Sequence, residues 1–200
     1  MTSEPEFQLW DKHPLLEKLR FFDIEASGLH EGSYPLQFGW CGIDLKTSDI
    51  LVRPEPDWTE DLYAPQSFEI HGIAYETAMK DGIAAVDAAR SLNTHFDGTA
   101  VICDSPSWDG YWTTRLSDTT GVPLLFGLND FGNMANTFGS IYDRWSVANY
   151  HRLLEAVDTF YPHTHRAPDD AQRMGALTRM FIDREWAEWL LERQAFLPKS

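Results

Sequence analysis

The sequence predicts a three-layer α/β/α domain, in which helices cover both faces of a mixed β-sheet. Residues 19–52 contain three strand patterns at hairpin spacing, which is typical of an antiparallel meander. The rest of the chain alternates helical patterns with short apolar strands, as in other layered α/β domains. The 200 residues suffice for one sizeable core and are few for two, so we expect one domain over residues 1–200.

The meander is predicted from strand formers and turn residues. Phe21, Phe22 and Ile24 favour a strand, and Ser27-Gly28 marks its end. A largely apolar stretch, a polar turn and a second apolar stretch follow. The three strands are expected from residue 19 to the stop at Ser27-Gly28, at 34–44 and from residue 50 onward.

Beyond residue 64, helices and strands are expected to alternate. A short helix ends at Gly72, and an unbroken apolar run at 99–103 indicates a buried central strand. Apolar side chains at helical spacing in the last helix favour a core position over an oligomer contact. Helices are predicted at 83–96, 108–116, 131–142, 149–157 and 167–194, and a further strand at 122–127.

The apolar and aromatic content is that of a globular protein. A formal net charge of -15 argues against sequence-blind binding to long nucleic acid, but not against an enzyme that holds a few phosphates through metal ions. Cys41 and Cys103 lie in apolar runs and are expected to be buried thiols. Neither a secretion signal nor a membrane-spanning run is present, so we expect a soluble, cytoplasmic protein without a membrane partner.

The first strand carries two acids on one face. Because side chains alternate along a strand, Phe22 and Ile24 point to one face, and Asp23 and Glu25 point to the other. Adjacent carboxylates repel each other, and a divalent cation between them would remove the repulsion. An exposed strand face is the alternative explanation of the same pattern.

Two further regions place acids at the ends of elements. Asp104 and Asp109 follow the predicted central strand, where α/β sheets bind ligands. Asp104 is better explained as a helix cap, whereas Asp109 fits a helix-dipole role and a functional role equally well. His165 is expected in a loop before the last helix, and Asp170 in its first turn. A loop histidine near a metal-bound acid suits a general base, although a lone loop histidine is more often a solvent-exposed side chain.

These residues together resemble the DEDDh branch of the DnaQ-like 3′–5′ exonucleases, the superfamily of RNase T and oligoribonuclease. Phe22-Asp23-Ile24-Glu25-x-Ser27-Gly28-Leu29 is similar to the first motif, and Ile70-His71-Gly72-Ile73 to a segment that follows it. Asp109 stands at the second motif, and His165-Arg166-Ala167-x-x-Asp170-Ala171 matches the third. The resemblance covers roughly residues 19–180 and implies a ribonuclease H-like fold.

The chain departs from the family pattern at two points. The second motif usually begins with a His-Asn pair, and Asp104-Ser105 stands there instead. Pro168 replaces the usual leucine of the third motif. The first departure concerns how this loop holds a substrate, and the second concerns where the last helix begins.

The resemblance implies a two-metal-ion phosphodiester hydrolase. Asp23, Glu25, Asp109 and Asp170 would hold two Mg²⁺ or Mn²⁺ ions, and His165 would deprotonate the attacking water. The product would be a nucleoside 5′-monophosphate from the 3′ end of a single-stranded or short nucleic acid. The residues implied in substrate binding are Ala26, Ser27, Gly28, Leu29, Phe68, His71 and Arg166.

Two other functions fit the same residues. The chain could be a non-catalytic nucleic-acid or protein-binding module, since a fold does not fix a function. It could also be a metal-dependent phosphatase acting on a nucleotide. The presence of all five catalytic residues favours the exonuclease. A preference for RNA or DNA does not follow from the sequence, and a homodimer stays open because several relatives of this kind are dimers.

Overall fold

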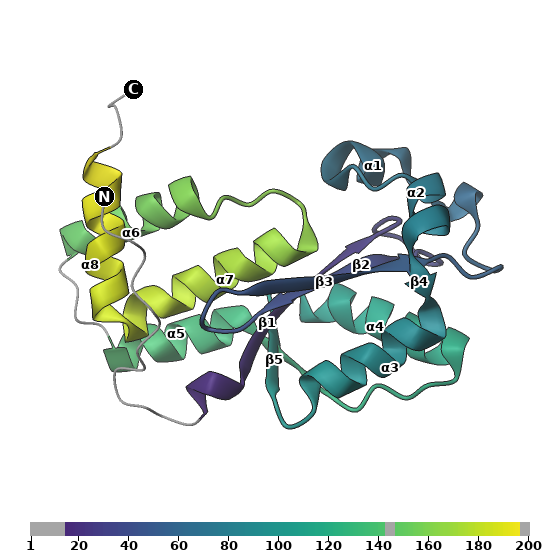
Figure 1. Cartoon of the computed structure of the whole chain (residues 1–200), viewed down its shortest axis with the longest axis horizontal. Coiled ribbons are helices and arrows are strands. Elements are labelled where there is room, and N and C mark those ends of the chain that lie inside the picture. The colour runs from purple at the N-terminus through teal and green to yellow at the C-terminus, as the bar shows by residue number, and fades with distance from the viewer. Residues whose placement is uncertain (1–14, 143–146, 197–200) are drawn as a thin grey trace.

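The computed structural model describes residues 15–142 and 147–196 and contains a mixed six-stranded sheet with helices on both faces (Figure 1). The strand order is β4-β3-β2-β1-β5-β6. The meander pairs are antiparallel, whereas β1 with β5, β5 with β6, and β3 with β4 are parallel. The strands are β1 (Leu19–Ala26), β2 (Pro35–Cys41), β3 (Thr47–Arg53), β4 (Ile83–Ala84), β5 (Ala100–Cys103) and β6 (Leu128–Asp130).

Two layers of helices enclose this sheet. Helices α3 and α4 cover one face, and α7 with α5 covers the other (Figure 1). The helices are α1 (Pro65–His71), α2 (Tyr75–Asp81), α3 (Ala85–Phe96), α4 (Pro106–Thr120), α5 (Phe131–Tyr142), α6 (Val147–Phe160), α7 (Ala167–Ile182) and α8 (Arg184–Ala195), with 3-10 turns at Leu16–Lys18 and Glu60–Leu62. The predicted fold class is confirmed.

Strand β1 divides the core. Phe22 and Ile24 pack with α3 and α4, whereas Phe21 packs on the other face with Met174 of α7. Burying apolar groups on both faces fixes the register of β1, because a slip of one residue would exchange them for the carboxylates. Cys41 and Cys103 are fully buried and unpaired with each other, as expected.

The prediction of a strand at 122–127 is wrong. This segment is irregular, and strand β6 begins only at Leu128. Asn93 of α3 holds the segment instead: its amide donates to the Pro123 carbonyl over 2.9 Å and accepts from the Leu125 amide over 2.7 Å. These bonds satisfy backbone groups that a strand ladder would otherwise use, and they leave the Leu125 side chain 81% exposed.

The long helix predicted at 167–194 is two helices. Asp183 interrupts it with an extended backbone, φ -125° and ψ 91°. The Asp183 carboxylate accepts from the Trp186 amide over 3.0 Å as the cap of α8, and from Arg179 Nε over 3.0 Å. A capping acid that also pairs with a buried arginine stabilises a break that helical periodicity does not reveal. The apolar set of both helices forms core, as predicted.

Two short elements escaped prediction. Helix α2 fills the stretch after Gly72, where the φ of 69° ends α1 as expected. Strand β4 takes the first two residues of the predicted helix 83–96, because Ile83 and Ala84 pair with β3. Helices α4 and α6 extend beyond their predicted ends.

Helix α7 begins in direct contact with the sheet. A Cβ atom at Gly39 of β2 would lie 2.1 Å from the carbonyl carbon of Ala167 and 2.1 Å from the nitrogen of Pro168. Gly39 is also the cross-strand partner of Asp23. The absent side chain therefore brings the first turn of α7 beside the acids of β1.

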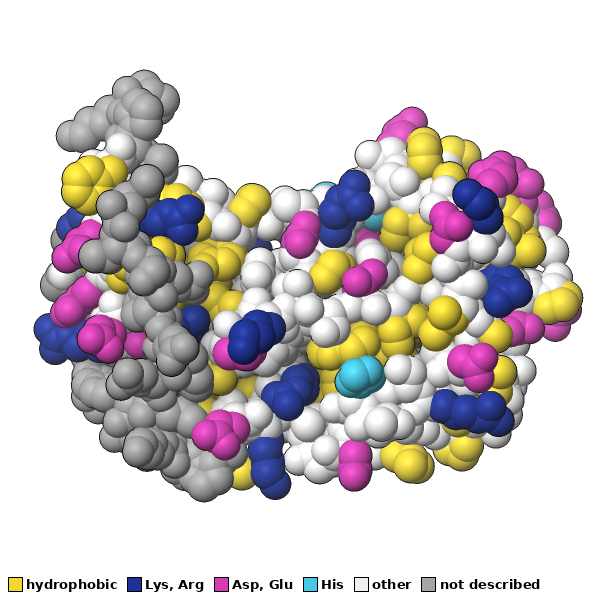
Figure 2. Space-filling view, viewed as in Figure 1, with side chains coloured by type: hydrophobic (Ala, Val, Ile, Leu, Met, Phe, Trp, Pro, Cys, Tyr) yellow, Lys and Arg dark blue, Asp and Glu magenta, His cyan; other side chains and the backbone are white. Residues whose placement is uncertain are grey.

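The surface is mixed in charge. On the face in Figure 2, lysine and arginine side chains lie dispersed among acidic and uncharged ones. Within the described part of the chain, no helix is both long and apolar enough to cross a bilayer.

Candidate active site

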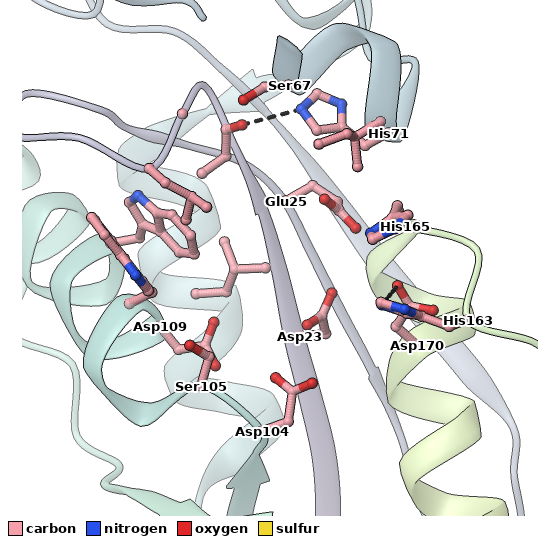
Figure 3. Close-up of a pocket in the computed structure, with 17 residues that line it drawn as sticks. Asp23, Glu25, Ser67, His71, Asp104, Ser105, Asp109, His163, His165 and Asp170 are labelled. Carbon is pink, nitrogen blue, oxygen red and sulfur yellow. Dashed lines mark hydrogen bonds and ion pairs between the residues drawn. The ribbon is translucent and has the colours of Figure 1, made fainter.

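A pocket of about 340 Å³ opens where β1 and β5 end (Figure 3). Its walls are α1, α4 and the segment that leads into α7, and β1 forms its floor. The volume lies at the lower end of the range for small-molecule sites. All five predicted catalytic side chains line it: Asp23, Glu25, Asp109, His165 and Asp170.

Strand β1 supplies the first two acids. Asp23 and Glu25 point away from Phe22 and Ile24, as the alternation of a strand predicts, and toward α7 (Figure 3). Each of the two offers an oxygen within 4.8 Å of the other and of an Asp170 oxygen. These three carboxylates form the closest acidic group of the pocket.

Helix α4 supplies Asp109 from the opposite wall. Its side chain is 1% exposed and lies outside the three-carboxylate group. The thiol of Cys103 donates a hydrogen bond to it, but within the described chain its Oδ2 atom has no partner. A buried carboxylate oxygen without a donor is costly, and a cation in the pocket would compensate it.

Asp104 does not cap the helix as predicted. The cap residue of α4 is Ser105, whose side chain makes no capping bond. Asp104 is exposed and lines the pocket as a fifth carboxylate. The cap prediction fails because α4 begins at Pro106, so the capping position falls one residue later.

Asp170 and His165 come from the start of α7. Asp170 lies in the first turn, as predicted, and one of its oxygens accepts from the Thr164 amide over 2.9 Å. Its other oxygen lies 3.2 Å from His163 Nε2. His165 is exposed and has a φ of 54°, which is uncommon outside glycine. Pro168 takes the second helical position, because the helix begins at Ala167, as predicted.

Burial raises the pKa of the four acids Asp23, Glu25, Asp109 and Asp170, and repulsion between carboxylates adds to it at Asp23, Glu25 and Asp109. Burial, followed by repulsion from Asp170, Asp109 and Asp104, raises the pKa of Glu25 to about 7, against a small opposing effect of Arg166. Burial also raises the pKa of Asp109 to about 7. The pKa of Asp23 is raised by burial and by Glu25, and burial raises that of Asp170. The pocket therefore favours either protons or cations.

The metal-free protein should lose stability as the pH rises. Because the folded pKa values of Glu25 and Asp109, about 7, lie above their ordinary values of 4.5 and 3.8, the folded state binds more protons in this window than the unfolded chain. Raising the pH through 7 removes these protons, so the free energy of unfolding falls. We expect the metal-free melting temperature to decrease between about pH 5 and about pH 8.

Glu25→Gln isolates this effect. At about pH 8 the variant should be more stable than the natural chain by on the order of 1–2 kcal/mol without metal, and its pH dependence should be flatter. Glu69→Gln, which changes an exposed glutamate of α1, is the matched control and should follow the natural chain. Equal pH profiles for the natural chain and Glu25→Gln would contradict the expectation.

The residues expected to bind substrate divide into two groups. Ala26, Gly28, Leu29 and His71 line the pocket. Ser27, Phe68 and Arg166 are not among its lining residues.

Each member of the second group lies beside the pocket. Ser27 is buried, and its hydroxyl accepts from the Tyr34 amide over 3.0 Å. Phe68 is exposed on α1. Arg166 is exposed, and its charge lowers the pKa of Glu25.

His71 is engaged within the protein at both ring nitrogens. Its Nε2 lies 3.1 Å from the Ala26 carbonyl, and its Nδ1 accepts from the Ile73 amide over 3.1 Å. The histidine therefore fixes the end of α1 to the end of β1. Its part in substrate binding would be to shape the pocket.

The rim after β1 is anchored to α4. Tyr111 accepts from the Gly32 amide over 2.8 Å, and Trp112 Nε1 donates to the Ser33 hydroxyl over 2.9 Å. The Ser27 carbonyl also accepts from the Ala64 amide over 2.7 Å. These bonds hold the turn that presents Leu29, whose side chain is 69% exposed at the pocket edge.

Three prominent lining residues escaped sequence analysis. Trp108 and Trp112 of α4 stack at 5.5 Å between ring centroids and face the pocket. Their spacing of four on the helix that carries Asp109 could have indicated this wall. His163 lies two residues before His165, and its ring centroid lies 4.2 Å from that of His165.

Comparisons with known proteins give structural neighbours. No protein-family model matches the chain, and no curated protein matches its sequence. A structure of exonuclease I, described as suggesting how processivity is achieved, is similar over 88% of this chain and 43% of its own, at TM-score 0.63 and 15% identity.

Two further exonuclease I structures are similar to the chain. The E. coli enzyme in complex with a dA16 oligonucleotide aligns at TM-score 0.60 and 16% identity, over 86% of this chain and 42% of its own. The enzyme of Methylocaldum szegediense aligns at TM-score 0.60 and 18% identity, over 89% and 44%. The chain thus spans less than half the length of these proteins, and the likeness shows a shared ribonuclease H-like fold.

Proposed function

We propose that this chain is a metal-dependent 3′–5′ exonuclease that releases nucleoside 5′-monophosphates from single-stranded or short nucleic acid. The observation that carries the proposal is the meeting of four acids and a histidine in one pocket. They come from three segments far apart in the sequence: β1, α4 and the start of α7. The shared fold with exonuclease I agrees with this function.

The donor set fits divalent cations. Asp23, Glu25, Asp109 and Asp170 offer carboxylate oxygens, which are the ligands of Mg²⁺ and Mn²⁺. The raised pKa values and the partnerless Oδ2 of Asp109 are features that such ions would relieve. Two bound divalent ions would balance the four carboxylates and supply electrostatic stabilisation of the attacking and leaving oxygens.

His165 is the proposed general base. It lines the pocket from an exposed position next to the acid group, so its ring can reach a water at a phosphodiester. Its backbone, with positive φ, directs the side chain from the loop before α7. The imidazole would accept the proton of the attacking water while Asp170, five residues later, stays fixed by the Thr164 amide.

The pocket and the surface favour a small portion of a single strand. A cavity of about 340 Å³ accommodates a terminal nucleotide, and the exposed Leu29 at its edge offers an apolar face for a base. Apolar contact of this kind does not read hydrogen-bonding groups, so it tolerates any base. The net charge of -15 and the dispersed cations of Figure 2 do not favour a long duplex.

A direct assay tests the proposal. The purified chain with Mg²⁺ is expected to convert a 5′-labelled single-stranded oligonucleotide into a ladder shortened from its 3′ end, with nucleoside 5′-monophosphates as products. Chelation should stop the reaction. Release of inorganic phosphate from a mononucleotide, with no shortening of the oligonucleotide, would favour a phosphatase instead.

A second measurement separates an enzyme from a binding module. A ligand that binds only the folded state raises the melting temperature, so Mg²⁺ or Mn²⁺ should stabilise the chain. In the oligonucleotide assay described above, a duplex of the same sequence is the control substrate and should be degraded more slowly than the single strand. Oligonucleotide binding without cleavage, together with no stabilisation by either ion, would overturn the proposal.

A further inference from the structure

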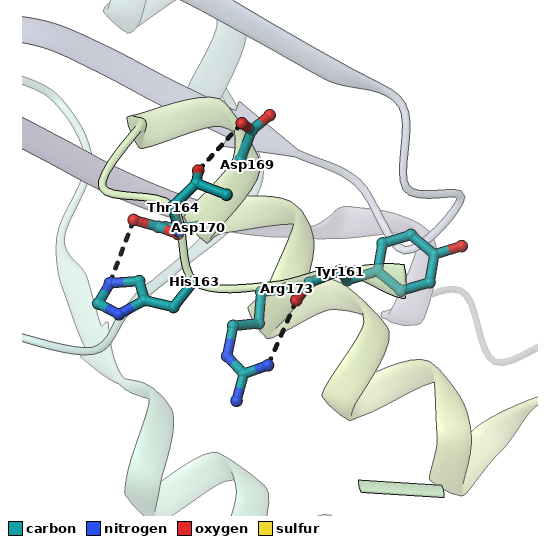
Figure 4. Close-up of polar contacts among 6 residues, drawn as sticks. All are labelled: Tyr161, His163, Thr164, Asp169, Asp170 and Arg173. Atoms are coloured by element: carbon teal, nitrogen blue, oxygen red, sulfur yellow. Dashed lines mark hydrogen bonds and ion pairs between the residues drawn. The ribbon is translucent and has the colours of Figure 1, made fainter. Parts of the chain in front are cut away.

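The segment between α6 and α7 brings two histidines to one acid. His163 and His165 flank Thr164, and all three surround the Asp170 carboxylate (Figures 3 and 4). One nitrogen of each ring and one oxygen of Asp170 lie within 4.8 Å of one another. His163 belongs to none of the motifs that indicate a nuclease, so its place here is a property of this chain.

We propose that His163, His165 and Asp170 form a second cation site, selective for a transition-metal ion such as Zn²⁺. Two imidazole nitrogens and one carboxylate oxygen, with water as a fourth ligand, are a set that Zn²⁺ accepts. Mg²⁺ instead prefers oxygen ligands. The donor chemistry therefore separates this site from the all-carboxylate group of Asp23, Glu25 and Asp170.

The geometry is close to what a tetrahedral ion requires. Bonds of about 2.0–2.2 Å place neighbouring ligand atoms about 3.3–3.5 Å apart. The His163 Nε2 and Asp170 Oδ2 atoms are already 3.2 Å apart. A nitrogen of His165 lies within 4.8 Å of a His163 nitrogen and an Asp170 oxygen, and its exposed side chain has room to rotate toward them. The ion would lie between the His163 and Asp170 atoms in place of their direct contact.

The surroundings hold these ligands in place. The Thr164 amide donates to Asp170 Oδ1 over 2.9 Å, which leaves Oδ2 for the ion. The Thr164 hydroxyl donates to Asp169 Oδ2 over 3.0 Å, and Arg173 Nη1 donates to the Tyr161 carbonyl over 3.3 Å (Figure 4). The first bond orients a ligand directly, and the other two fix the chain next to His163 and Asp170. With its side chain 54% exposed, His163 is accessible to an ion from solvent.

The site would regulate the pocket, a consequence that rests on the proposed function. Asp170 belongs to both groups of ligands, and His165 is the proposed base. An ion held by His163 would bind an Asp170 oxygen and the lone pair of His165 at the same time. Neither group would then be available for its proposed role in nucleotide release. Zn²⁺ is therefore expected to inhibit Mg²⁺-dependent nucleotide release, and His163→Gln should weaken this inhibition.

Metal binding without any substrate tests the site. Zn²⁺ is titrated into the full chain by calorimetry, and Co²⁺ is added separately to record the visible absorption of a four-coordinate complex. The natural chain should bind one equivalent at this site. His163→Gln should bind Zn²⁺ roughly tenfold or more weakly, since losing a ligand costs at least as much as losing an outer contact, and should lose the cobalt absorption.

Two variants serve as controls. His151→Gln removes an exposed histidine of α6, and Asp23→Asn removes a carboxylate that only the other group uses. Both should retain the zinc affinity and the cobalt absorption. Natural affinity in His163→Gln, or loss of affinity in either control, would overturn the proposal. The titration involves no nucleic acid, so its failure leaves the nuclease proposal untouched, and an inactive nuclease leaves the titration valid.

Discussion

Asp23→Asn is expected to lower the Mg²⁺-dependent release of nucleoside monophosphates by about a thousandfold, because stabilisation of a transition state by metal ions contributes several kcal/mol. Asparagine keeps the size of the side chain but removes the charge. Asp23 lies on the floor of the pocket, and its pKa is raised by burial and by the charges of Glu25, Asp109, Asp104 and Asp170. The loss of rate should therefore come from weaker metal binding and not from unfolding.

Stability and a second aspartate provide the controls. Without metal, Asp23→Asn should melt at or above the temperature of the natural chain, since the substitution removes repulsion. Stabilisation by Mg²⁺ should decrease in the same variant. Asp118→Asn changes an exposed acid of α4 and should leave the rate unaltered. Nucleotide release by Asp23→Asn at the natural rate would remove the metal mechanism.

Gly39→Ala is expected to destabilise the fold by about 3 kcal/mol or more, at the upper end of overpacking effects. The added methyl carbon would lie 2.1 Å from backbone atoms of Ala167 and Pro168, which cannot rotate away as a side-chain end can. Helix α7 must then move off β2. Because α7 carries Asp170, this displacement should also separate its carboxylate from Asp23 and reduce metal-induced stabilisation.

Chemical denaturation with and without Mg²⁺ measures both effects. The matched control is Gly127→Ala, because a Cβ atom there meets nothing within 4 Å and Gly127 has no positive φ. Its effect should stay within about 0.5 kcal/mol. If Gly39→Ala matched this control in stability, the close packing of α7 on β2 would be incorrect.

Local patterns in the sequence predicted much of the framework. The alternation in β1 assigned Phe22 and Ile24 to one face and Asp23 and Glu25 to the other, as the structure has it. The unbroken apolar run at 99–103 indicated the buried strand β5, and Gly72 indicated the end of α1. These features depend on residues close together in the chain, which is why periodicity and turn chemistry reveal them.

The errors arose where hydrogen bonds of single polar side chains decide the structure. The Asn93 side chain of α3 forms hydrogen bonds with backbone groups of the segment 122–127. This apolar segment has strand character but therefore stays irregular. Asp183 ends α7 because Arg179 and the start of α8 both use its carboxylate. Neither partnership is visible in the spacing of apolar residues. A tertiary contact thus overrode local propensity at 122–127, whereas a local helix cap did so at Asp183.

The pocket could be predicted only through motifs. Spacing alone left His165 as an exposed loop residue and Asp109 equally suited to a helix-dipole role. The structure brings both to the acids of β1, while their proposed chemical roles stay predictions. The wall of Trp108 and Trp112 was missed because aromatic side chains on a helix usually indicate core.

The anchored turn after β1 has a consequence for discrimination among substrates. Tyr111 and Trp112 fasten Gly32 and Ser33 to the helix that also carries Asp109, so the pocket edge and this acid form one stiff unit. A pocket edge that is already ordered loses little conformational entropy when a ligand binds. The same edge moves little to make room for a larger ligand. Under the proposed function, nucleic-acid strands that bear a bulky 3′ blocking group should therefore be excluded from the pocket.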